Sequence, residues 1–253
     1  MYTSDIFSLQ WILASCAVVF AAFIRGVSGF GQAMILAPIL LLMLNSKSVV
    51  PIVLFIGLFL NIILLRYAFR HVNFNRITPI IIGSLLGIPL GTFIIKIIDP
   101  MLLKMLIGSI TIIFAVPLAL NLALPFARER LVSGVFGFIS GILATSTGLP
   151  GPPIVLYIHN QKWEKAMIHG SLTMGSMFAG SFSLIALFLS GFINLDIFIY
   201  AASFIPALLV GLGLGMIAFF RINPRFFRLL SMGVVIIAGI MGILSALEII
   251  SLS

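Results

Sequence analysis

The sequence has 253 residues, of which 62% are hydrophobic and only 8% charged, and its formal net charge is +8. A soluble domain typically has about 45–50% apolar and about 25% charged residues, and no single soluble core could bury this much apolar surface. The composition therefore excludes a soluble enzyme, a nucleic-acid-binding protein and a disordered chain, and it predicts an integral membrane protein in a lipid bilayer. Cys16 is the single cysteine, so a disulfide framework or a cysteine-based metal site within one chain is excluded.

Apolar runs fill nearly the whole chain and are separated by short loops. A bilayer core takes about 20 helical residues to cross, and in chain order the expected helical runs cover residues 6–24, 49–69, 77–98, 101–124, 131–144, 166–193, 197–220 and 226–250. Two further runs, 33–44 and 154–158, are too short to cross alone. Each follows a break that is rich in Gly, Ser or Thr, at residues 25–32 and 145–153. The N-terminal eight residues carry no basic side chain and do not resemble a cleaved signal peptide, so we expect the first run to be retained.

The two broken regions resemble one another and indicate a duplication. Placing Pro38 over Pro153 also places Gly26 over Gly141, and a later Gly-x-x-x-Gly pair aligns at a similar shift. We therefore predict one membrane domain built from two repeats, residues 1–125 and 126–253.

Basic residues predict the orientation, since Lys and Arg are enriched in cytoplasmic loops. The clusters at residues 66–76 and 221–228 should be cytoplasmic, and both termini, which lack basic residues, should be outside. With these sides fixed, each broken region must enter and leave the membrane on one side. The predicted fold is an all-α integral membrane protein of two inverted repeats, each with a re-entrant helical hairpin and three transmembrane helices. The alternative is ten spans in two parallel halves, against which the short second arms argue.

Arg25 is the charged residue placed deepest in an apolar run. A buried arginine needs a partner, and all six acids, Asp5, Asp99, Glu129, Glu164, Asp196 and Glu248, lie at expected span ends. An anionic ligand could be the partner; alternatively, Arg25 extends to an interface or binds backbone carbonyls. The short helices that begin near Gln32 and Pro152 would direct their N-termini, which favour anions, at the midplane. Asn61 is expected to form a hydrogen bond between helices.

The candidate substrate-binding residues combine a cation, hydroxyl and amide donors, and glycines that let the backbone approach a ligand. They are Arg25, Ser28, Gly29, Gly31, Gln32, Thr145, Ser146, Thr147, Gly148 and Gly151. Glycine in a membrane helix more often mediates packing, and this alternative best fits the Gly-x-x-x-Gly motifs. His159 and His169 could titrate near neutral pH, but a lone histidine at a membrane interface more often has a structural role. No catalytic residue, cofactor or metal site is expected, since the chain has no intramembrane His/Glu/Asp cluster.

These features favour a secondary transporter that moves a small anion outward through a midplane site formed by the two broken helices. Without a carboxylate at membrane depth, potential-driven export or exchange fits better than proton-coupled uptake. An anion channel and a carboxylate-anion permease remain alternatives, and a membrane enzyme or an accessory subunit is a third class.

Two segments carry a resemblance to a known family. Arg-Gly-Val-Ser-Gly-Phe-Gly-Gln-Ala-Met-Ile-Leu-Ala-Pro-Ile-Leu, at 25–40, resembles the first repeat motif of the TauE/SafE family, and Gly-Leu-Pro-Gly-Pro-Pro-Ile-Val-Leu-Tyr, at 148–157, resembles its partner. The resemblance covers essentially the whole chain. It implies a permease that exports sulfite or an organosulfonate across a prokaryotic plasma or inner membrane, and it leaves a homodimer open.

Overall fold

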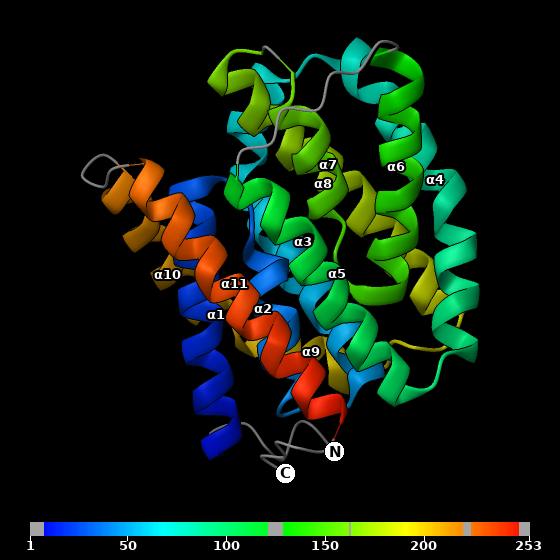
Figure 1. Ribbon diagram of the computed structural model, residues 1–253. Coiled ribbons are helices and arrows are strands. Elements are labelled where there is room, and N and C mark those ends of the chain that lie inside the picture. Colours follow the sequence, from blue (N-terminus) through cyan, green and yellow to red (C-terminus); the bar gives the residue numbers. More distant parts are fainter. Residues whose placement is uncertain (1–7, 121–128, 162, 220–223, 248–253) are drawn as a thin grey trace.

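A computed structural model describes residues 8–120, 129–161, 163–219 and 224–247, and in this part of the chain it contains helices and no strand (Figure 1). The helices are α1 (Leu9–Ser28), α2 (Gln32–Leu41), α3 (Ser46–His71), α4 (Phe74–Ile97), α5 (Pro100–Leu120), α6 (Glu129–Thr147), α7 (Gly151–His159), α8 (Lys165–Leu189), α9 (Leu195–Ser203), α10 (Ile205–Phe219) and α11 (Pro224–Ala246). The all-α prediction is confirmed. The chain ends and Arg221, which were used to predict orientation, lie outside the described residues.

Within the described residues, seven helical stretches are long and apolar enough to cross a membrane. They are α1, α3, α4, α5, α6, the residues 166–189 of α8, and residues 195–218, which comprise α9 and most of α10. Large apolar side chains such as Leu86, Phe93 and Phe188 lie exposed on these helices, as expected of surfaces that face lipid. The protein is a multi-pass membrane protein.

The two breaks are shorter than the sequence indicated. The first is Gly29–Gly31, and the second covers residues 148–150, so Arg25 lies inside α1 and the 145–147 hydroxyl residues lie inside α6. The hydroxyls remain compatible with a helix because each donates a hydrogen bond to the carbonyl four residues earlier. The helices end where glycine adopts a positive φ, 79° at Gly29 and 76° at Gly148.

Glycines let two pairs of helices approach to backbone contact. A Cβ atom added at Gly141 of α6 would collide with the carbonyl of Ser84 on α4, and one at Gly211 of α10 would collide with the carbonyl of Val19 on α1. The packing interpretation of the Gly-x-x-x-Gly motifs is therefore confirmed. As a result, α1 packs against α10 and α6 packs against α4, while α3 packs on α8 and α5 on α11.

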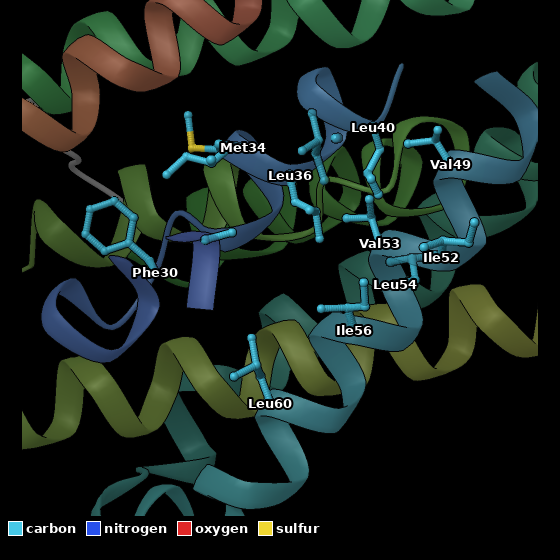
Figure 2. Close-up of a cluster of buried hydrophobic side chains, with 14 of the residues drawn as sticks. Phe30, Met34, Leu36, Leu40, Val49, Ile52, Val53, Leu54, Ile56 and Leu60 are labelled. Atoms are coloured by element: carbon cyan, nitrogen blue, oxygen red, sulfur yellow. The ribbon is translucent and has the colours of Figure 1, made fainter. Parts of the chain in front are cut away.

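The short helices α2 and α7 lie in the interior of this bundle (Figure 1). Eight of the ten residues of α2 are buried, as expected of a helix that is apolar on all sides. Figure 2 shows Leu36 and Leu40 of α2 beside Val49 and Val53 of α3. This packing holds the N-terminus of α2 at a fixed place inside the protein.

Candidate functional site

A cavity of about 40 Å³ lies between the two helix breaks. Its walls come from both breaks and from α3 and α8, which pack against one another. The lining residues are Arg25, Phe30, Gly31, Gln32, Ala33, Met34, Val53, Leu54, Gly57, Leu58, Asn61, Gly148, Pro150, Gly151, Pro152, Val155, Leu172, Ser176, Met177 and Gly180. A single water needs roughly 10–15 Å³ of such space, so the cavity has room for a ligand of several atoms.

Arg25 contributes the charge in this cavity. Its side chain is only 7% exposed, contrary to the alternative in which it extends to a membrane interface. One terminal nitrogen, Nη2, donates a 2.8 Å hydrogen bond to Oδ1 of Asn61, which confirms that Asn61 bonds between helices. The Nε atom is buried and has no hydrogen-bond partner in the described part of the protein. Because Asn61 is neutral, it positions the guanidinium without balancing its charge.

Gln32, the first residue of α2, lines the same cavity as Arg25. Its side chain is 5% exposed, and Nε2 has no partner among the described residues. Leaving a buried donor unsatisfied costs about 1–3 kcal/mol. The backbone N–H groups of the first helical turn also lack partners within α2, and no side chain caps this end. The cavity lining therefore includes donors of three kinds: a guanidinium, an amide and a helix N-terminus.

The second break supplies fewer hydrogen-bond donors to the cavity than the first. Pro150 and Pro152 line the cavity, and proline has no backbone N–H to donate. Ser140 fixes this segment by donating a 2.6 Å hydrogen bond to the carbonyl of Pro150. A Cβ atom added at Gly151 would meet nothing within 4 Å, so packing does not require glycine there. The second break thus shapes the cavity more than it supplies donors.

The structure divides the ten candidate residues from the sequence into two groups. Five line the cavity: Arg25, Gly31, Gln32, Gly148 and Gly151. The other five, Ser28, Gly29, Thr145, Ser146 and Thr147, lie outside its lining. The four hydroxyls in this group donate to helix carbonyls, as that of Ser28 does to the carbonyl of Ile24 at 2.7 Å, a common way for helical Ser and Thr to satisfy their donors. Binding roles for all ten residues stay predictions.

Sequence reasoning did not assign the residues that α3 and α8 contribute, among them Gly57, Ser176 and Gly180. Gly57 and Asn61 are four residues apart and so share a helix face. That spacing of a small and a polar residue in an apolar run was the available signal for α3. Ser176 and Gly180 of α8 have the same four-residue spacing, so the same signal was available there.

Both histidines contact the first break. The ring of His159 meets the ring of Phe30 edge-on, with centroids 5.4 Å apart, and a Cβ atom on Gly29 would collide with the imidazole of His169. Neither histidine lines the cavity. No group of three or more His, Cys, Asp or Glu side chains that could hold a metal ion occurs among the described residues.

Comparison with known proteins gives one finding. Residues 14–242 match the protein family described as "Sulfite exporter TauE/SafE". No match was found among the curated proteins or among the solved structures.

Proposed function

Because the chain belongs to the TauE/SafE sulfite exporter family, we propose that it is a secondary transporter that carries a small oxyanion, such as sulfite or an organosulfonate, out of the cell. The observation that carries the proposal is that one cavity is lined by two buried donors without a partner among the described residues, Nε of the Arg25 guanidinium and Nε2 of Gln32. An oxyanion in the cavity would accept from both groups. Charge-assisted hydrogen bonds of this kind are about twice as strong as neutral ones.

The architecture that we propose for transport is a pair of inverted repeats whose breaks meet at the cavity. The packing supports it: the first helix of each half lies on a helix of the other half, α1 on α10 and α6 on α4. Each half also has a short interior helix after a glycine break, α2 and α7. The start of α1 and the end of α11 lie at the same end of the molecule (Figure 1). Inverted repeats with broken helices at the site are common in secondary transporters.

The charge of the cavity supports outward movement. The lining residues described above include no carboxylate, so no acidic side chain there can bind and release a coupling proton. A monovalent anion leaving a cell with a negative interior gains about 2.3 kcal/mol per 100 mV. The membrane potential alone can therefore drive export.

The test is flux through the purified full-length protein in proteoliposomes with an imposed potassium-diffusion potential. Sulfite and methanesulfonate should leave the vesicles with saturable kinetics, at rates well above those of protein-free vesicles and of vesicles with acetate. A preference for acetate would instead favour a carboxylate permease. Non-saturating flux with single-channel currents would favour an anion channel, and no anion flux at all would contradict the proposal.

A labelling experiment tests the inverted arrangement. We would place cysteines at Lys47, just after the first hairpin, and at Gln161, just after the second, in a protein whose exposed Cys16 is replaced by alanine. We expect an impermeant maleimide to label Lys47→Cys from outside the cell and Gln161→Cys only after the cytoplasmic side is opened. Labelling of both positions from one side would remove the inverted-repeat model.

A further inference from the structure

The cavity holds one formal charge. Arg25 is the sole ionisable side chain among its lining residues, and its described neighbours there are neutral or apolar. We propose that the site selects singly charged oxyanions and excludes doubly charged ones, so that each transport step moves one negative charge. This inference rests on the proposed function and specifies its substrate class.

The charge balance follows from burial. One guanidinium compensates one negative charge, and a second charge on the ligand would lie in an enclosure walled largely by apolar side chains such as Val53, Leu54 and Leu172. Burying an ion without a counter-ion is strongly unfavourable, because its hydration is lost and little replaces it. The remaining donors, Asn61 and Gln32, are neutral. The α2 N-terminus adds only a partial charge, and its effect falls off within the first turn.

The four described acids lie at the starts of helices. Glu129 and Asp196 are in the first turns of α6 and α9, and Asp99 and Glu164 immediately precede α5 and α8. None of these four lines the cavity, so none weakens the positive potential that Arg25 creates there.

This selection has a chemical consequence for oxyanions that exist in two charge states. The form with one proton more, such as hydrogen sulfite, is the form that binds. The proton then crosses the membrane on the substrate and returns to solvent when the anion is released and deprotonates. No side chain of the protein needs to carry that proton, in agreement with a cavity that has no carboxylate.

The test compares two probes of nearly identical shape in proteoliposomes of the full-length protein. Methyl sulfate is a monoanion at every pH used, whereas methyl phosphate becomes a dianion above its second pKa of about 6. Between pH 5 and pH 8, we expect flux of methyl phosphate at limiting concentration to fall on the order of 100-fold, following its monoanion fraction. Flux of methyl sulfate should change less than about twofold, since its charge does not change.

The outcomes distinguish a failure of the monoanion selection from a failure of the proposed transport function. Undiminished methyl phosphate flux at pH 8 would overturn the monoanion selection and leave the transporter proposal standing. A parallel fall of both probes would also overturn it, because titration of the protein would then set the pH dependence. Absence of flux for both probes and for sulfite would overturn the proposed function itself.

A substitution at Gln32 provides an independent test of charge selection. Gln32→Lys places a second cation where an unpartnered amide now lies in the cavity. We expect the ratio of methyl phosphate to methyl sulfate flux at pH 8 to rise by about tenfold, equivalent to about 1.4 kcal/mol. Gln32→Met, of similar length and neutral, is the matched control and should leave the ratio unchanged. An unchanged ratio in a folded Gln32→Lys protein would count against charge selection at this site.

Discussion

Replacing Arg25 with alanine should abolish anion transport while the protein still inserts and folds. The substitution removes the cavity's one formal charge and the unpartnered Nε donor. Truncating one partner of a buried charge pair typically costs about 2–5 kcal/mol, which corresponds to a roughly 30- to 4000-fold loss at low substrate. The measurement is initial flux of sulfite or methanesulfonate in proteoliposomes. Folding is checked by size-exclusion elution and thermal unfolding in detergent.

Two further variants separate the contribution of the Arg25 charge to transport from that of its geometry. Arg25→Lys keeps the charge but loses the planar group, so flux should be intermediate. Asn61→Leu removes the 2.8 Å hydrogen bond that orients the guanidinium, and it should weaken transport less than Arg25→Ala does, since the charge remains. Normal flux in Arg25→Ala would eliminate Arg25 as a substrate ligand.

The second large effect concerns stability, at the contact between α1 and α10. Gly211→Ala would drive a Cβ atom into the carbonyl oxygen of Val19, a backbone atom that cannot rotate away. Overpacking of this kind costs about 1–3 kcal/mol, so we expect the melting temperature in detergent to fall by roughly 2–12 °C.

The matched control for this prediction lies two residues away on the same helix. A Cβ atom at Gly213 would meet nothing within 4 Å, so Gly213→Ala should leave the melting temperature within about 1–2 °C of the parent, as surface substitutions usually do. Equal shifts in the two variants would show that the loss of glycine itself, and not the contact with Val19, determines the effect.

The long helices could be predicted from the sequence because a run of about 20 apolar residues has few alternatives to a membrane helix. The start of α2 at Gln32 was also predicted, since the preceding Gly31 marks the break. The run expected at 197–220 does form one stretch long enough to cross a membrane, at 195–218, but it consists of two helices that meet at Phe204. Pro206 explains the interruption, because it cannot donate to the carbonyl of Ala202. It could not be foreseen, since proline is also found inside uninterrupted helices, as Pro89 is in α4.

The site was only partly predictable for a related reason. Arg25 and Gln32 were recognisable as a cation and a donor near a break, since both stand out in apolar sequence. The hydroxyls at 145–147 stood out equally, yet each donates within its own helix. Which polar residues face the cavity depends on how α3 and α8 cross the two breaks. That crossing is a tertiary arrangement, which no local pattern in the sequence specifies.

The first helix of each half of the chain packs against a helix of the other half, so the two halves depend on one another for their packing. The glycine-lined faces of α4 and α10 are each filled by the opening helix of the opposite half. A half expressed alone would leave one such face empty and one opening helix without its groove. Since α3 with α8 and α5 with α11 also pack across the halves, the two halves of the chain are not two independently packed units. Neither half of the chain therefore completes its helix packing without the other.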